Sequence, residues 1–175
     1  GLAPADGWQV GSSYTVQISP AVTGPLGTSQ PISWQFQTAV PAILSLTPAD
    51  GDAVSVSAGE STLRAVFDHA IDDAALLAEG GVRLLKEGKE IPGSVPAYDS
   101  DTQTVTFAPI EGLRPGTSYQ AIISAAVGGP RAPGDFSWRF STAVPGLQSV
   151  SPYPGEKGVS TDTLEVAVVT FSVPI

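Results

Sequence analysis

The segment WQFQTAVP at residues 34–41 returns as WRFSTAVP at residues 138–145, a spacing of 104 positions. Phe67 recurs as Phe171 at the same spacing, and Ile71 recurs as Ile175. A period of about one hundred residues is too long for a solenoid repeat and fits a string of small domains. We therefore expect tandem modules, and repeated domains of this kind more often separate or connect other parts of a protein than catalyse reactions.

The repeat sets the module boundaries within the 175 residues. Strand-like and turn-like segments cover one whole period, and only parts of a period precede and follow it. The sequence therefore predicts the C-terminal part of a preceding module at 1–40, a complete module at 41–144 and the N-terminal part of a following module at 145–175.

The complete module alternates short apolar segments with Gly- and Pro-containing turns, a pattern typical of strands with one buried face. Strands are expected at 42–47, 54–57, 62–67, 82–85, 90–97, 102–107, 119–124 and 136–142. Asp72 can begin one short helix over 72–79, which Gly80 and Gly81 can end. Many short strands with turns at regular intervals indicate an all-β, two-sheet sandwich with Greek-key connections.

Several motifs occur in the order found in a known family. SLTPADG stands at 45–51, VTFAP at 105–109, LRPGTSY at 113–119 and WRFST at 138–142. Together they resemble the fifth bacterial Ig-like family, which occurs in tandem arrays in exported and surface proteins. The resemblance covers 41–144 in full and both flanks in part. It implies an Ig-like sandwich that supplies a scaffold and no catalytic residues, located outside the cell, on its surface or in the periplasm.

Four aromatic residues are interpreted as structural. The motif LxPGxxY ending at Tyr119 recurs as WxVGxxY ending at Tyr14. A tyrosine at the start of a strand, just after a glycine turn, resembles the tyrosine corner of sandwich domains, so we favour this role over ligand stacking. Trp34 and Trp138 lie mid-strand between aromatic neighbours. This position favours packing in the core over a sugar-binding platform.

Catalytic chemistry finds little support. His69 is the only histidine, cysteine is absent and no Gly-x-Ser-x-Gly motif occurs, so nucleophilic triads and zinc sites are excluded. We interpret His69 as a solvated loop residue. Nothing in the sequence pairs Glu79, Glu87 or Glu90 across a cleft, which disfavours acid–base glycoside hydrolysis.

Calcium is the one cofactor that the acidic turns bring into question; no other cofactor is expected. Short acidic pairs stand in predicted loops at Asp50 and Asp52, Asp72 and Asp73, and Asp99 and Asp101. Loops at one end of a sandwich could supply the many oxygen ligands of calcium, but no EF-hand motif is present. Aspartate is also common in turns because its carboxylate accepts hydrogen bonds from nearby amides, and we favour that interpretation.

The charge and the hydropathy exclude further partners. The formal net charge is −9, and no basic patch is available to neutralise phosphates, so nucleic acids and anionic membrane surfaces are not expected to bind. No apolar run approaches the roughly 20 residues that span a bilayer, so membrane insertion of this segment is not expected either.

Function is expected to follow from the joins between modules. Residues 38–42 and 142–146 leave almost no linker, and a proline restricts each join. We therefore favour a rigid, non-enzymatic spacer or stalk in a large bacterial exported or cell-surface protein. The alternative is an adhesin module that recognises a glycan or host protein through its end loops, of which 127–135 differs from 22–31. An accessory domain beside an extracellular hydrolase or protease inhibitor stays open.

The expected partners are neighbouring repeats. Two strands alone are marginal in water, and their edges invite pairing. An odd-stranded sandwich puts its termini at opposite ends, so the two partial modules of one molecule cannot easily meet. We therefore hypothesise that the 1–40 part of one chain pairs with the 145–175 part of another, forming a dimer or fibre.

Overall fold

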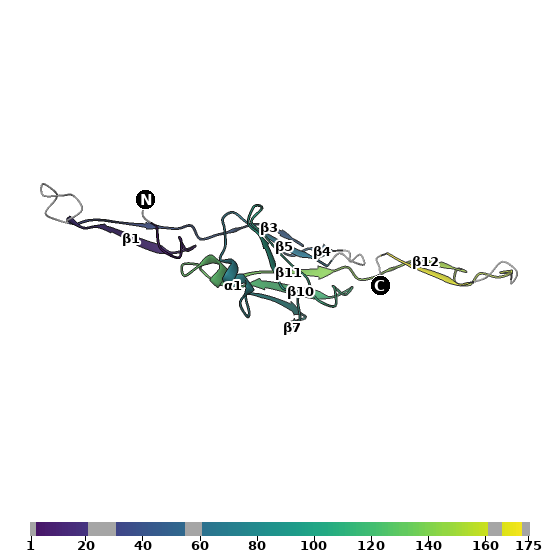
Figure 1. Ribbon diagram of the computed structural model, residues 1–175. Coiled ribbons are helices and arrows are strands. Elements are labelled where there is room, and N and C mark those ends of the chain that lie inside the picture. The colour runs from purple at the N-terminus through teal and green to yellow at the C-terminus, as the bar shows by residue number, and fades with distance from the viewer. Residues whose placement is uncertain (1–2, 21–30, 55–60, 161–165, 173–175) are drawn as a thin grey trace.

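The computed structural model describes residues 3–20, 31–54, 61–160 and 166–172. It places a hairpin, a sandwich and a second hairpin one after another in an elongated arrangement (Figure 1). The first hairpin consists of β1 (Ser13–Ile18) and β2 (Ile32–Gln37), and the second of β12 (Leu147–Ser151) and β13 (Val168–Phe171). The two hairpins lie at opposite ends of the sandwich, as expected for the termini of a domain with an odd number of strands.

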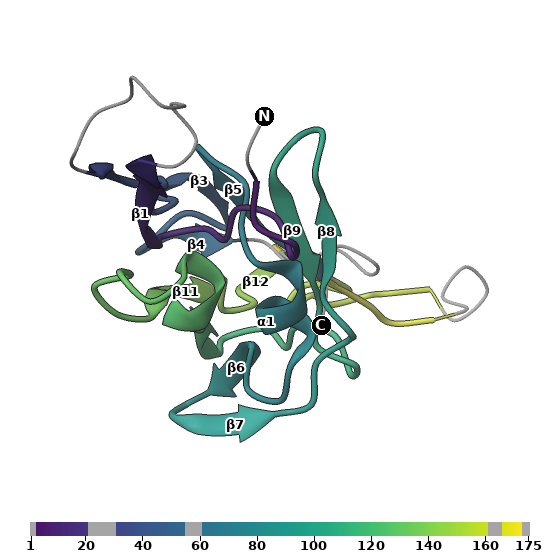
Figure 2. The same cartoon turned by 60° about the vertical axis from the view of Figure 1, so that its left-hand side comes forward.

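Within the described residues, the central sandwich has a four-stranded and a five-stranded sheet (Figure 2). The four-stranded sheet has the order β3 (Ile43–Thr47), β5 (Leu63–Phe67), β9 (Thr104–Phe107) and β8 (Ala97–Asp99). The five-stranded sheet has the order β4 (Ala53–Val54), β11 (Phe136–Thr142), β10 (Ser118–Ile123), β6 (Val82–Lys86) and β7 (Lys89–Ile91). Only β4 pairs in parallel among these described strands.

The chain crosses between the sheets in Greek-key fashion. It passes from β5 to β6, from β7 to β8 and from β9 to β10, each time leaving one sheet for the other. In this order β5 lies beside β9 and β6 beside β10, the arrangement of an Ig-like sandwich. The predicted all-β Greek-key fold is therefore confirmed.

Alternate residues of the inner strands form the core. Along β5 and β11 the buried side chains are separated by more exposed ones, as a pleated strand with one covered face requires. Edge-to-face aromatic pairs connect the sheets: the Phe67 and Phe136 rings lie 5.4 Å apart, and those of Phe107 and Trp138 lie 6.1 Å apart. These contacts hold the two layers in register at their centre.

One short helix, α1 (Asp73–Leu77), follows β5 as expected. The Asp72 carboxylate caps it by accepting a hydrogen bond from the Ala75 amide at 3.0 Å, and Leu76 anchors it in the core. Gly81 is required after the helix, because a Cβ there would overlap with the Leu76 carbonyl oxygen. A 3₁₀ helix, η2 (Ala125–Gly128), packs beside α1.

The structure corrects one predicted strand and leaves others partly outside its description. The expected strand at 90–97 is wrong, because β7 ends at Ile91 and β8 begins at Ala97 in the other sheet. Pro92 and Pro96 lack amide donors, so this segment suits a crossing between sheets better than a continuous strand. Residues 55–57 of another expected strand, Ile175, and nearly all of the loop at 22–31 lie outside the described residues.

Candidate functional site at the first junction

The first junction is the place where the β1–β2 hairpin meets the sandwich. Residues 38–42 alone connect β2 to β3. Two hydrogen bonds between Asp68 and Ala42 hold the start of the sandwich. The Asp68 carboxylate accepts from the Ala42 amide at 2.7 Å, and the Asp68 amide donates to the Ala42 carbonyl oxygen at 3.0 Å. Pro41 is completely buried. The connection is therefore short and fixed at its downstream end.

Three glycines bring the two parts into backbone contact. Gly11, with φ +57°, lies on the end of η2, and a Cβ there would overlap with the Gly128 carbonyl oxygen. A Cβ on Gly129, with φ +77°, would overlap with the Val10 carbonyl oxygen. Both Gly11 and Gly129 thus combine a left-handed backbone with an approach too close for a side chain, which only glycine satisfies.

Arg131 adds two hydrogen bonds across the same contact. Its backbone amide donates to the Gly11 carbonyl oxygen at 3.2 Å, and its guanidinium Nη1 donates to the Thr38 carbonyl oxygen at 3.0 Å. Both acceptors belong to the hairpin and both donors to the sandwich. The first junction is therefore held by directed bonds in addition to the covalent connection.

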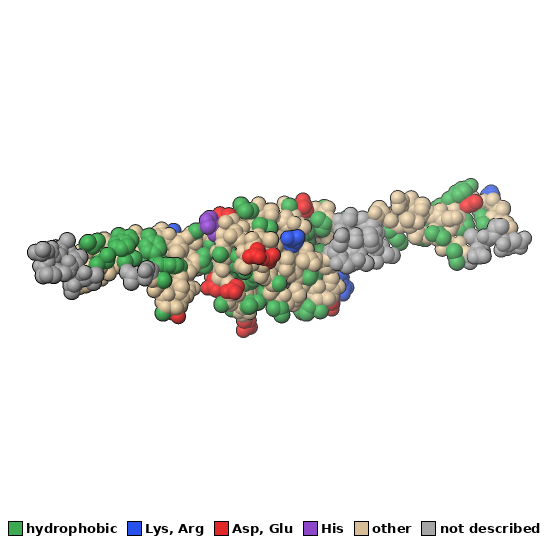
Figure 3. Space-filling view, turned by 45° about the horizontal axis from the view of Figure 1, so that its top comes forward, with side chains coloured by type: hydrophobic (Ala, Val, Ile, Leu, Met, Phe, Trp, Pro, Cys, Tyr) green, Lys and Arg blue, Asp and Glu red, His purple; other side chains and the backbone are tan. Residues whose placement is uncertain are grey.

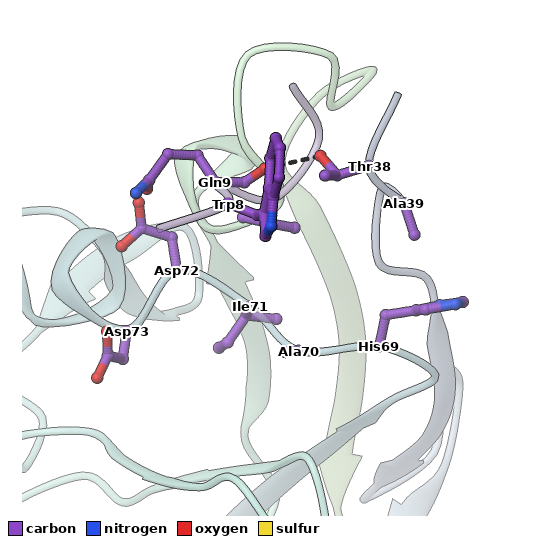
Figure 4. Close-up of a pocket in the computed structure, with 10 residues that line it drawn as sticks. Trp8, Gln9, Thr38, Ala39, His69, Ala70, Ile71, Asp72 and Asp73 are labelled. Atoms are coloured by element: carbon purple, nitrogen blue, oxygen red, sulfur yellow. Dashed lines mark hydrogen bonds between the residues drawn. The ribbon is translucent and has the colours of Figure 1, made fainter. Parts of the chain in front are cut away.

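A cleft of about 340 Å³ lies beside this contact (Figure 4). Its lining comes from Trp8, Gln9, Val10, Thr38 and Ala39 of the hairpin and from His69, Ala70, Ile71, Asp72 and Asp73 of the sandwich. The figure shows the Trp8 ring beside Gln9. The His69 side chain is directed away from Trp8. Trp8 is 47% exposed and makes edge contacts with Tyr14 and Phe36. The cleft therefore lies between the hairpin and the sandwich.

Asp68, next to the cleft, and Asp72, in its lining, accept hydrogen bonds from backbone amides. His69 Nδ1 lies 2.9 Å from the Asp68 carboxylate, and its side chain is more than half exposed. The hydrogen bond from the Ala42 amide, followed by that from His69, lowers the pKa of Asp68. Asp72 caps α1, as described above. His69 is thus a loop residue with one carboxylate partner, and no nucleophile is arranged with it among the described residues.

The calcium candidates Asp50 and Asp52 act as acceptors in their own turn. The Asp50 carboxylate accepts from the Arg139 amide of β11 at 2.8 Å, and the Asp52 carboxylate accepts from the Ala49 amide at 3.0 Å. The first bond attaches the turn to the neighbouring sheet. The Asp52 contact is that of a turn aspartate, which bonds a nearby amide, whereas the Asp50 contact reaches the other sheet.

Asp99 is the last residue of β8, and Asp101 lies in the turn between β8 and β9. The Asp99 carboxylate accepts from the Thr102 hydroxyl and the Asp101 amide, both at 2.9 Å. These hydrogen bonds, that of the Thr102 hydroxyl foremost, lower the pKa of Asp99. Across the parts of the chain that the structure describes, no three histidine, cysteine or acidic side chains gather as a metal site would require.

The two tyrosines make the same corner contact. The Tyr119 hydroxyl accepts from the Arg114 amide at 2.8 Å, and the Tyr14 hydroxyl accepts from the Gln9 amide at 2.6 Å. Each ring stacks on a phenylalanine of the paired strand, with ring centroids about 5.5 Å apart. This is the bond that a tyrosine corner makes to the backbone just upstream.

The two tryptophans differ. Trp138 is 2% exposed in the core, whereas Trp34 is 47% exposed on the β1–β2 hairpin. The core packing predicted for Trp34 is therefore absent, because no second sheet faces β1 and β2 among the described residues. The space-filling view shows apolar side chains gathered on this hairpin (Figure 3).

Sequence reasoning missed the residues that make the junction. In the sequence alone, Gly128 and Gly129 resemble ordinary turn residues, and nothing marks Arg131. One signal was available: Gly11 and Gly116 stand at the same place in the two repeated tyrosine motifs.

No helix in the described part of the chain is both long and apolar enough to cross a membrane.

A comparison with protein-family models agrees with this fold. The family model of the bacterial Ig-like domain Big_5 matches residues 37–142, more than half of the chain. No curated protein matches the sequence. Solved structures with similar arrangements include the S-layer protein rSbsC(31-844), at 14% identity and a TM-score of 0.41 over 64% of this chain. LD transpeptidase LdtMt1 in complex with imipenem is similar at 18% identity and a TM-score of 0.41 over 62%.

CopC from Methylosinus trichosporium OB3b is similar at 12% identity and a TM-score of 0.41, over 59% of this chain and 94% of its own. The similar region spans only 15% of the S-layer protein and 42% of the transpeptidase. The family match covers the whole sandwich from the end of β2 to the end of β11. The chain belongs to the bacterial Ig-like domain family.

Proposed function

We propose that this chain is a rigid, non-enzymatic spacer segment of a bacterial exported or cell-surface protein. The observation that carries the proposal is the first junction, where Arg131 and the glycine contact fix the hairpin on the sandwich. A flexible tether between domains is rich in Gly and Ser and makes no such contacts. A string of domains joined in this way keeps its ends apart.

The use of the polar side chains supports a scaffold role. Asp50, Asp68, Asp72 and Asp99 each accept hydrogen bonds from backbone amides. A catalytic group instead has to be directed toward a substrate position within hydrogen-bond reach. Membership of the bacterial Ig-like family supports the same conclusion, since its sandwich serves as a framework.

The test is a measurement of shape in solution. Small-angle scattering of the 175-residue chain should give the elongated profile calculated from the arrangement in Figure 1. A variant with Gly-Ser-Gly-Ser inserted between Val40 and Pro41 is the matched control, because it keeps every module residue and lengthens only the connection. The insertion should broaden the distribution of sizes. A native chain as variable as the insertion variant would refute the spacer function.

Binding through the end loops is the competing function, and the structure supplies an observation about it. The loop at 127–135, the expected recognition loop, uses Gly128, Gly129 and Arg131 to contact the hairpin. This supports a junction role for that segment. A glycan array or pull-down in which binding depends on the outer residues 133–135 would instead support the adhesin function.

A further inference from the structure

The opposite end of the sandwich repeats the hairpin side of the first junction. We propose that the turn at Gly116, with the adjoining end of β11, is a docking surface for the 125–131 loop of a following copy of this module. The inference rests on the proposed spacer function and deepens it by naming the partner of each module end. The surface around Gly116 is called the second docking surface below.

The hydrogen bonds of the two ends correspond one by one. The Gly11 amide donates to the Ala39 carbonyl oxygen at 2.9 Å, and the Gly116 amide donates to that of Ala143 at 3.0 Å. The Ser12 amide donates to the Thr38 hydroxyl at 2.8 Å, just as the Thr117 amide donates to the Thr142 hydroxyl at 2.9 Å.

The remaining contacts of this network match as well. The Thr38 hydroxyl donates to the Gln9 carbonyl oxygen, and the Thr142 hydroxyl to that of Arg114. Gly116 has a φ of +61° against +57° for Gly11. The backbone that receives η2 and Arg131 at the first junction is therefore built again at the second docking surface.

The residues at the first junction are more buried than their counterparts at the second docking surface. Gly11 is buried under the loop of the sandwich, whereas Gly116 is exposed. Pro41 is completely buried at the first junction, whereas Pro145, its counterpart in the repeat, is only half-buried. Val144, which follows the second docking surface, is 76% exposed. These residues are the ones that a docked loop would cover.

The start of the second hairpin is held as the start of the sandwich is. The Gly146 amide donates to the Ser172 hydroxyl at 2.9 Å, and the Ser172 amide donates to the Gly146 carbonyl oxygen at 2.8 Å. Asp68 and Ala42 make the corresponding pair at the first junction. The first residues of a following module are therefore held by the same pair of hydrogen bonds as the first residues of the sandwich. This favours the same placement of the 125–131 loop of that module.

The chemistry of the surface defines the occupant. A loop that approaches Gly116 as η2 approaches Gly11 needs glycine where Gly129 stands, because a Cβ there would overlap with the backbone across the contact. It also needs an amide donor for the Gly116 carbonyl oxygen and a long cationic side chain for that of Thr142, as Arg131 provides for Gly11 and Thr38. The 125–131 loop of a second copy meets each requirement.

The experiment joins two copies directly. A chain of residues 1–144 followed by a second copy of 41–144 recreates the natural Ala-Val-Pro connection at its second junction. The chain has no cysteine, so Lys89→Cys in both copies gives one pair of spin labels, at an exposed position on β7. Double electron–electron resonance then reports the distance distribution between the copies.

We expect a single narrow distance in the tandem chain. Gly116→Asn in the first copy should abolish the narrow peak, because asparagine tolerates the left-handed backbone but its side chain occupies the docking surface. Gly129→Asn in the second copy should do the same from the opposite side. Gly80→Asn is the matched control, since Gly80 has φ +76° and a Cβ there would meet nothing within 4 Å, and it should leave the peak unchanged.

The outcomes separate the two proposals. If both junction variants keep the narrow peak, docking at Gly116 is refuted while a rigid spacer stands. If the unsubstituted tandem already gives a broad distribution, both the docking and the spacer function are refuted. Circular dichroism melting of each variant identifies any that fail to fold, and the other variant of the pair then decides the question.

Discussion

The β1–β2 hairpin and the β10–β11 hairpin carry the same sequence pattern in different surroundings. Their registers agree, since Tyr14 lies opposite Phe36 as Tyr119 lies opposite Phe140. Their tyrosine corners agree as well. Their surroundings differ, because β10–β11 is flanked by β6 and β4 in its own sheet and faces a second sheet, whereas β1–β2 has neither among the described residues. Pairing and turn chemistry are thus local properties of this pattern, whereas a core requires the opposite layer.

The loss of stability on substitution should follow the burial of the side chain. The largest expected difference is between Trp34 and Trp138, which stand at equivalent positions of the repeat. Trp138→Ala removes a side chain that is 2% exposed and should lower the free energy of unfolding by about 3–5 kcal/mol. Trp34→Ala removes one that is 47% exposed and should cost about 0.5 kcal/mol or less. Urea unfolding of both variants measures the difference.

The indole nitrogen of Trp138 offers a control, since it is buried and has no hydrogen-bond partner among the described residues. Trp138→Phe, which removes this unpaired donor and keeps an aromatic ring, should therefore cost less than Trp138→Ala. Equal losses for the alanine variants of Trp34 and Trp138 would show that burial does not distinguish the two hairpins.

The tyrosine corners should show a smaller difference of the same kind. Tyr119→Phe leaves the Arg114 amide without its acceptor and should cost about 1 kcal/mol of unfolding free energy. Tyr14→Phe breaks the same bond on a hairpin whose ring is only half-buried, where water can replace the hydroxyl. Its effect on sandwich unfolding should be close to zero. A larger loss from Tyr14→Phe would mean that the hairpin and the sandwich unfold together.

The backbone contact at the first junction can be tested without a large change in global stability. Gly129→Ala should speed hydrogen exchange of the Arg131 amide, because the added Cβ separates that amide from the Gly11 carbonyl oxygen. Gly80→Ala introduces the same left-handed strain where nothing lies within 4 Å, and should leave exchange at Arg131 unchanged. NMR-detected exchange measures both. Slow exchange in Gly129→Ala would contradict the contact.

The smallest expected effect is a dependence on pH that differs between the two junctions. The pKa of Asp68 is lowered by the Ala42 amide and His69, so its ionised form favours the folded state. That contribution is present above the ordinary pKa of 3.8 and is lost as the pH falls through the lower folded value. Ser172 occupies the corresponding position at the other junction and does not titrate in this range.

The protection of the Ala42 amide against exchange should therefore fall as the pH drops below 3.8, whereas the protection of the Gly146 amide should not change through this step. Asp68→Ser is the matched control, because it gives the first junction the acceptor of the second and should remove the difference. If the protection of the Ala42 amide in the native chain does not change through this pH range, the carboxylate does not hold that amide.

Much of the fold could be predicted because it depends on local patterns. The alternation around Leu63 and Trp138 indicated two facing sheets, and the glycine turn before Tyr119 indicated its corner. The switch of sheets between β7 and β8 was missed, because apolar residues continue through a segment that two prolines interrupt. The exposure of Trp34 was missed because its pattern is that of a core strand, and a strand does not specify whether its partner layer is present.

The junction could not be predicted from composition or periodicity. Gly11 and Gly129 are 118 positions apart, and each alone resembles an ordinary turn glycine. What joins them is the close approach of two backbones, which only the three-dimensional arrangement reveals. Arg131 is equally unmarked in the sequence, since its acceptors are main-chain carbonyl groups, which every residue type carries.

The fixed contact between Gly11 and Gly129 has a geometric consequence for a longer array. When every step from one copy to the next uses the same rotation and translation, the array is helical, and the geometry of one junction sets its pitch. Gaining or losing one copy then changes the reach by one step and also turns whatever stands at the tip by a constant angle. The number of copies would thus set both the height and the facing direction of the tip.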